Sequence, residues 1–224
     1  MKQAAKSPTS PSGAASKTPV ALGFRAHSGW AALVAVAGSP RPACPPIEPL
    51  VIDRRRIELA RAGVPVQPYH AAAELELKQA AELIARCAQE ACELAREALL
   101  GRVAQLRQKG YDVVGCGVLL SSGGSASTLE STLASHALIH TAEGELFRNA
   151  IAQASESCSL PVTRVKEREL HARAAMEFGL RPDELPRRLN ELGRTLGPPW
   201  RQDQKYAALI AWLALGAAAR EAYA

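Results

Sequence analysis

Two histidines and a glutamate with spacing suited to chemistry lie in the middle of the chain. His136, His140 and Glu143 occupy positions i, i+4 and i+7, so on a helix their side chains fall within about 60° of one another. Imidazoles at i and i+4 can share a transition-metal ion, with the carboxylate as a third ligand or as a hydrogen-bond acceptor for a ligand. The same groups could instead transfer protons as a general acid and base. This face is therefore the first candidate for a functional site.

Apolar residues on the same face support a plainer interpretation. Leu129, Leu133 and Phe147 extend the stripe, as expected for a helix packed against a core. In that case both histidines are packed core residues, and one of them is hydrogen-bonded to Glu143. The sequence favours this interpretation over a metal or acid–base site, and a solvated face is the third alternative.

The helix that carries these side chains follows an apolar run and a short polar loop. Val113–Leu120 is apolar without alternation, which predicts a strand covered on both faces. Ser121–Ser125 is favoured as a flexible connection over a phosphate-binding loop, because the lysine of a P-loop is missing. Ser127 and Glu130 have the spacing of a capping box, so the helix is expected to start there and to run to about Ser155.

The rest of the chain alternates between apolar runs and helical patterns. Turn residues at Arg25–Gly29 separate two apolar runs, which predicts a hairpin, and Gly101 marks the expected kink or break in a long helix. The order predicts an α/β fold with a five-stranded mixed sheet, in which a three-stranded meander precedes alternating helices and strands, with helices on both faces. The other expected strands are Val20–Phe24, Trp30–Ala37, Leu50–Leu59 and Leu160–Val165, and the other expected helices are Ala71–Lys109, Glu167–Phe178, Asp183–Leu192 and Trp200–Ala219.

Two segments carry a resemblance to a known family. Leu22–Ser28 reads Leu-Gly-Phe-Arg-Ala-His-Ser, and Asp203–Trp212 reads Asp-Gln-Lys-Tyr-Ala-Ala-Leu-Ile-Ala-Trp. The first resembles the first-strand motif of RuvC-type Holliday-junction resolvases, an apolar strand ending in an acid and a turn, and the second resembles their last helix. The order of elements over Pro19–Ala219 is also similar to that of the ribonuclease-H-like superfamily. The resemblance implies a ribonuclease-H-like fold.

The same resemblance implies that most of the catalytic acids are missing. These nucleases use a cluster of carboxylates to hold two divalent ions, which activate water and stabilise the leaving oxygen. The acid of the first strand falls on Arg25, and the fourth strand reads Gly115-Cys116-Gly117 with no acid nearby. Only Asp203 remains at a matching position. Because one carboxylate cannot hold two metal ions, ordinary metal-dependent nuclease activity is not expected.

Arg25, His27 and Asp203 are expected to meet at the ends of the sheet if the resemblance holds. Arg25 would then bind an anion where the family binds metal. Alternatively, an ion pair between Arg25 and Asp203 has replaced the metal cluster, and the sequence favours this second interpretation.

The distribution of charge weakens a case for nucleic acid built on the net charge of +5. The first 47 residues account for all of it, and the remainder carries 22 basic and 22 acidic residues. Arg54–Arg56 could bind phosphate, although a solvated strand end is favoured. Arg164, Lys166 and Arg168 alternate with acids, which favours a mixed-charge surface.

Cysteine usage and hydropathy indicate the compartment. The five cysteines form no CxxC pair, which argues against a disulfide framework or a cysteine zinc site and indicates a reducing environment. No stretch has the length of a membrane span, so a cytoplasmic protein without a membrane partner is expected. Residues 1–18 are predicted to form a disordered tail, and residues 19–224 a single ribonuclease-H-like domain.

Two functions remain in competition. The first is a non-catalytic ribonuclease-H-like domain that binds structured nucleic acid or a protein partner, with a homodimer suggested by the long Ala-rich helix. The alternative is an enzyme of unknown reaction, a hydrolase among the options, with a histidine/glutamate site. The candidate catalytic residues are His27, His136, His140, Glu143 and Asp203, with Arg25 as the anion-binding residue; no metal ligand is assigned and no cofactor is identified.

Overall fold

A five-stranded mixed sheet forms the centre of the molecule. The computed structural model describes residues 17–38, 49–121, 127–181 and 183–221. The strand order is β3-β2-β1-β4-β5; the first three strands pair antiparallel, and β4 and β5 run parallel to β1. The predicted meander and mixed sheet are thus confirmed. The strands are β1 (Thr18–His27), β2 (Trp30–Ala37), β3 (Leu50–Glu58), β4 (Tyr111–Leu120) and β5 (Val162–Lys166).

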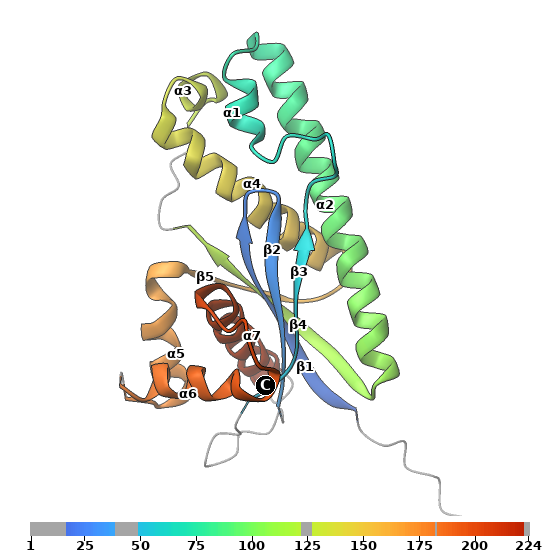
Figure 1. Ribbon diagram of the computed structural model, residues 1–224, viewed down its shortest axis with the longest axis vertical. Coiled ribbons are helices and arrows are strands. Elements are labelled where there is room, and N and C mark those ends of the chain that lie inside the picture. Colours follow the sequence, from blue (N-terminus) through green and yellow to red (C-terminus); the bar gives the residue numbers. More distant parts are fainter. Residues whose placement is uncertain (1–16, 39–48, 122–126, 182, 222–224) are drawn as a thin grey trace, which may run out of the picture.

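Helices cover both faces of the sheet (Figure 1). Alternating side chains of β1 divide between two cores: Leu22 and Phe24 pack with the α2 and α4 layer, and Ala21 packs with α7. Within the described residues, no helix is both long and apolar enough to cross a bilayer. The helices are α1 (Pro68–Ala72), α2 (Leu77–Gln108), α3 (Leu129–Leu133), α4 (His136–Ser157), α5 (Leu170–Phe178), α6 (Glu184–Leu192) and α7 (Gln202–Glu221), with short 3₁₀ turns at Glu167–Glu169 and Arg194–Leu196.

Helix α7 packs unusually close to the two central strands. A β-carbon on Gly23 of β1 would overlap the backbone of Ala207, and one on Gly117 of β4 would overlap the backbone of Ile210. Glycine at both positions therefore lets the helix backbone rest directly on the sheet. This close contact fixes the first turn of α7 over the carboxyl ends of β1 and β4.

The long helix differs from the prediction at its beginning and at Gly101. The expected helix Ala71–Lys109 consists of two helices, because α1 ends at Ala72 and α2 begins at Leu77. No break occurs at Gly101. Leu99 and Val103 on either side are buried in the core, and their burial outweighs the roughly 1 kcal/mol that a helical glycine costs.

The helix that carries the two histidines also starts later than expected. Thr128 rather than Ser127 caps α3, and its Oγ1 accepts a hydrogen bond from the Ser131 amide at 3.2 Å. The helix is then interrupted between Leu133 and His136, where α4 begins. The predicted loop Ser121–Ser125 lies outside the described residues except for Ser121, as does the predicted tail 1–18 except for residues 17 and 18.

The first strand extends beyond its predicted end. Arg25 and His27, expected in a turn, continue β1 and pair with Ala32 and Trp30 of β2. The His27 and Trp30 rings stack with centroids 4.4 Å apart, which adds a favourable cross-strand contact at the end of the hairpin. The turn is confined to Ser28-Gly29.

The buried thiol of Cys116 provides a test of the central strand. Burial raises its pKa to about 12, so at pH 8 roughly one thiol in 10⁴ is ionised. We expect iodoacetamide to leave Cys116 unmodified in the folded protein and to alkylate it in urea, as peptide mass spectrometry can show. The pKa of the thiol is near 9 in the unfolded chain and about 12 in the folded protein. Between these values the unfolded state loses its proton first, so the free energy of unfolding falls as the pH rises from about 9 to about 12. The half-buried Cys158 serves as the internal comparison, and equal labelling of both thiols in the folded state would contradict the assignment.

Candidate functional site

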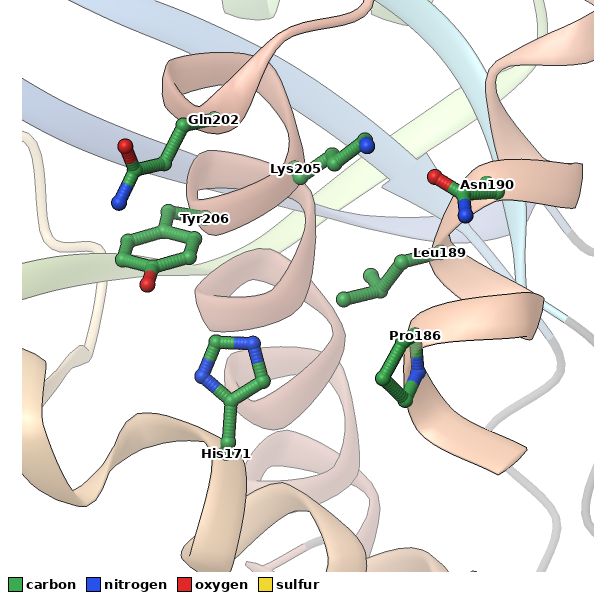
Figure 2. Close-up of a pocket in the computed structure, with 7 residues that line it drawn as sticks. All are labelled: His171, Pro186, Leu189, Asn190, Gln202, Lys205 and Tyr206. Atoms are coloured by element: carbon green, nitrogen blue, oxygen red, sulfur yellow. The ribbon is translucent and has the colours of Figure 1, made fainter. Parts of the chain in front are cut away.

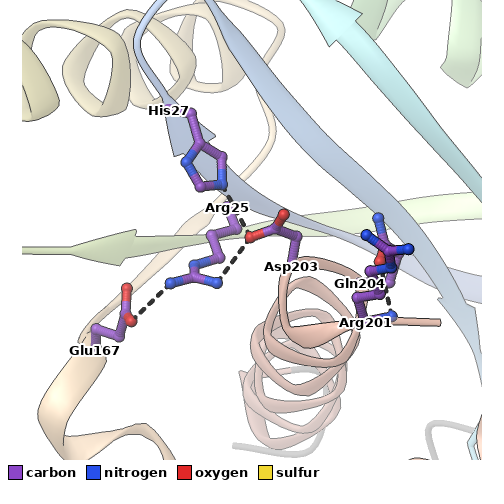
Figure 3. A network of polar contacts seen from close by, with 6 residues as sticks. All are labelled: Arg25, His27, Glu167, Arg201, Asp203 and Gln204. Atoms are coloured by element: carbon purple, nitrogen blue, oxygen red, sulfur yellow. Dashed lines mark hydrogen bonds and ion pairs between the residues drawn. The ribbon is translucent and has the colours of Figure 1, made fainter. Parts of the chain in front are cut away.

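An arginine is bound between two carboxylates at the carboxyl end of the sheet (Figure 3). Arg25 Nη1 donates to Asp203 Oδ1 at 2.7 Å, and Nη2 donates to Glu167 Oε1 at 2.9 Å. The guanidinium also lies over the ring of Tyr206, 4.8 Å from its centroid. The Arg25–Asp203 ion pair expected from the sequence is therefore present, and Glu167 joins it.

Three elements bring these side chains together. Arg25 lies near the carboxyl end of β1, Glu167 directly follows β5, and Asp203 lies in the first turn of α7. Because β1 and β5 run in the same direction, their carboxyl ends meet at one edge of the sheet, which is the usual location of ligand sites in α/β proteins. The glycine contacts beneath α7 hold Asp203 over this edge.

A histidine and a tryptophan extend the network along the meander. His27 Nε2 lies 2.9 Å from the same Asp203 oxygen that Arg25 contacts. On the other side, Trp30 stacks on His27, and the Arg56 guanidinium lies over the Trp30 ring at 4.1 Å. The resulting line runs from Arg25 through Asp203 to the His27 and Trp30 rings and Arg56, and it is partly exposed to solvent.

The charges around Arg25 disfavour a divalent ion at this position. The guanidinium already bridges Asp203 and Glu167, so a metal ion would have to displace a fixed positive charge. A second cation, Arg148 of α4, is close enough to Glu167 to interact with it electrostatically. Burial lowers the pKa of Arg148, and the neighbouring Glu167 opposes that shift.

The fourth strand contributes no carboxylate to this edge. Its last residues are Val118, Leu119 and Leu120. In the described part of the loop that follows, Ser121 donates to Glu145 of α4 at 3.2 Å. Cys116, further back in the strand, is buried in the core rather than placed at the site.

A pocket of about 280 Å³ lies on the α5–α6 side of the site (Figure 2). Tyr206 belongs to both: one contact is with Arg25, and the other is an edge-on contact with His171, whose ring centroid is 5.2 Å away. Lys205 projects from α7 into the same region. The pocket lining consists of His171, Pro186, Leu189, Asn190, Gln202, Lys205 and Tyr206.

The predicted histidine face forms a separate group with a residue that the sequence did not indicate. His136 and His140 are exposed, so the interpretation as packed core residues is wrong. Glu143 is buried, but its hydrogen bond is to His70 of α1 and not to either of them. α1 packs against the first turns of α4, and this contact supplies the third imidazole.

The six predicted site residues thus divide into two sets. Arg25, His27 and Asp203 come together, whereas His136, His140 and Glu143 lie on α4. Across the described chain, no hydrogen bond, ion pair or ring contact joins the two sets. A single enzyme site that uses all of them has no support in these contacts.

Sequence reasoning misses two contributors. The alternation of charges places Glu167 on a mixed-charge surface, although its position directly after a parallel strand is a signal that it faces the sheet edge. His70 has no comparable signal. It lies 66 residues before His136, directly before the start of the expected helix Ala71–Lys109.

Comparisons with known proteins bear on the fold. No protein-family model matches the chain, and no curated protein is significantly similar to it. Among solved structures, that of Thermus thermophilus RuvC aligns with 91% of this chain and 96% of its own length, with a TM-score of 0.51 and 12% sequence identity. The structure of T. thermophilus RuvC in complex with a Holliday junction substrate covers 91% and 95%, with a TM-score of 0.48 and 13% identity.

The chain has the ribonuclease-H-like fold. The fold predicted from the order of elements and from the two motifs is confirmed. In the ribonuclease-H-like arrangement seen here, β1, β4 and the start of α7 border one edge of the sheet, which is where Arg25 and Asp203 meet. At 12% identity the likeness extends to the fold and not to the chemistry.

Proposed function

We propose that this chain is a non-catalytic ribonuclease-H-like domain that binds structured nucleic acid. The observation that carries the first half is the position of Arg25, whose guanidinium contacts Asp203 and Glu167 at 2.7 and 2.9 Å. A two-metal site requires converging carboxylates, with the ions about 4 Å apart. With a fixed cation bridging its two acids, this edge of the sheet is not arranged to hold two metal ions.

The second half rests on the cations that surround the ion pairs. Acids at this end of the sheet are engaged by arginines: Glu58 pairs with Arg56, just as Asp203 and Glu167 pair with Arg25. Within the described residues, Lys166 and Lys205 have no acidic partner. Lys166 ends β5 next to Glu167, and Lys205 lines the pocket that Tyr206 shares with the site. Unpaired lysines near arginines and aromatic rings are features that contact phosphates and bases. The resemblance to RuvC-type resolvases supports a branched DNA as the first ligand to test.

We expect this protein to bind a DNA junction without cleaving it. We expect the protein to bind a fluorescent four-way DNA junction, with an affinity that falls as salt rises, and to leave the junction uncut in about 10 mM Mg²⁺ or about 1 mM Mn²⁺. The double variant Lys166→Ala/Lys205→Ala should bind about 10-fold more weakly and lower the salt slope by about 2, because two phosphate contacts are lost. Fluorescence anisotropy over a series of salt concentrations measures both quantities.

A matched control lies at the opposite end of the sheet. Lys109 is exposed at the end of α2, next to the start of β4, and Lys109→Ala removes the same kind of charge. It should bind the junction like the original protein. Cleavage of the junction that requires the metal ion would refute the non-catalytic assignment. Absent or salt-independent binding would refute the nucleic-acid assignment and leave a protein partner.

Self-association and the cytoplasmic location stay predictions from the sequence. Sedimentation velocity at two protein concentrations tests the homodimer: a sedimentation coefficient that rises with concentration supports it. A monomer at both concentrations would remove it and leave the binding proposal intact.

A further inference from the structure

Three of the five histidines of the chain converge outside the site described above. His70, His136 and His140 each place one ring nitrogen within 4.8 Å of those of the other two. The Nε2 atoms of His136 and His140 lie 3.0 Å apart. Two imidazoles bound to a tetrahedral ion at about 2.0–2.1 Å have their nitrogens about 3.4 Å apart, so only a small movement separates this arrangement from coordination.

The third histidine is held by a buried carboxylate. Glu143 Oε1 lies 3.2 Å from His70 Nδ1 and also accepts the His70 backbone N–H at 3.0 Å. When Nδ1 carries the proton and donates it to Glu143, Nε2 of His70 keeps its lone pair for a ligand. A carboxylate that orients a histidine in this manner is the common partner of imidazole ligands in metal sites.

Glu143 itself lacks compensation for its charge. Its side chain is 3% exposed, and Oε2 has no hydrogen-bond partner. A buried carboxylate with an unpaired oxygen is unfavourable unless a positive charge lies nearby. In the described structure its hydrogen-bond contacts are to the backbone N–H and ring of His70, and neither brings a fixed positive charge. A cation bound to the far side of His70 would supply it.

We propose that His70, His136 and His140 bind one divalent transition-metal ion of the zinc class, with Glu143 positioning His70. Imidazole nitrogens select zinc, cobalt, nickel or copper over magnesium and calcium. Three protein ligands on an exposed face leave a fourth position for water or another ligand, as in sites that activate water. The ion also ties α1 to α4, because His70 comes from one helix and the other two ligands come from the second.

Cobalt provides a direct spectroscopic probe. The reduced full-length protein is titrated with Co²⁺ while visible absorption reports the coordination number, and Zn²⁺ is then added in competition. We expect one Co²⁺ per chain with the strong visible bands of four-coordinate cobalt, displaced by Zn²⁺. His140→Ala should weaken binding at least about 100-fold, and Glu143→Gln about 10- to 100-fold, since the latter keeps the shape but loses the charge.

The chain supplies its own control. In the described structure His171 lines the pocket between α5, α6 and α7 and does not contact His70, His136 or His140. His171→Ala should therefore bind Co²⁺ like the original protein. His136 and His140 are exposed, so their alanine variants should keep the circular dichroism spectrum of the folded protein. Absence of four-coordinate cobalt in the original protein, or undiminished binding by folded His140→Ala, would overturn the site. Undiminished binding by Glu143→Gln would overturn the positioning role.

Discussion

Replacing Gly117 with alanine is expected to lower the free energy of unfolding by about 3 kcal/mol, which is large for the addition of one methyl group. The new β-carbon would collide with the backbone carbonyl of Ile210 in α7. A backbone cannot rotate away as a flexible side chain can, so α7 must shift from the sheet. Because α7 carries Asp203, the same shift should also loosen the contact with Arg25.

Gly101→Ala is the matched control for this substitution. Gly101 lies inside α2 with nothing within 4 Å of an added β-carbon, so alanine there should raise the free energy of unfolding by about 0.5–1 kcal/mol through its better helix propensity. Urea unfolding followed by circular dichroism measures both variants. A Gly117→Ala protein as stable as the original would show that α7 does not rest directly on β4.

The same glycines illustrate what a sequence can and cannot predict about this fold. Apolar runs and alternation identify strands because a half-buried strand repeats every two residues, and all five strands follow from these patterns. That Gly23 and Gly117 admit a helix backbone depends on which element packs against them. This is a property of the tertiary arrangement, because a glycine in a strand can equally mark a bulge or a tight bend.

The two candidate sites also combine features that local sequence patterns predict with features that only tertiary packing determines. His136 and His140 are identified because a helix repeats every 3.6 residues, so one turn brings i and i+4 together. Their exposure and their proximity to His70 depend on where α1 packs, and the spacing of residues along α4 does not determine that packing. Likewise Arg25 and Asp203, 178 residues apart, are connected only through the family resemblance.

Arg25→Asp is expected to turn the ion-pair network into a weak magnesium site. The substitution places a third carboxylate beside Asp203 and Glu167 and removes the cation that bridges them. Without metal, we expect the free energy of unfolding to fall by about 3 kcal/mol, since these groups are only partly exposed and repel one another. With a dissociation constant of about 1 mM, about 10 mM Mg²⁺ should restore about 1.4 kcal/mol by binding the folded state alone.

Arg25→Met distinguishes the effect of losing the cation from the effect of adding a carboxylate. It removes the positive charge at similar volume, so it should be destabilised too, but Mg²⁺ should not restore its stability. Thermal unfolding with and without Mg²⁺ compares the two variants with the original protein, and magnesium is chosen because imidazoles bind it poorly. Equal responses of Arg25→Asp and Arg25→Met to Mg²⁺ would show that the edge cannot gather three carboxylates around an ion. A response confined to Arg25→Asp would show that one residue separates a metal-binding edge from this arginine-bridged one, because the carboxylates of Glu167 and Asp203 already lie where a cation is held.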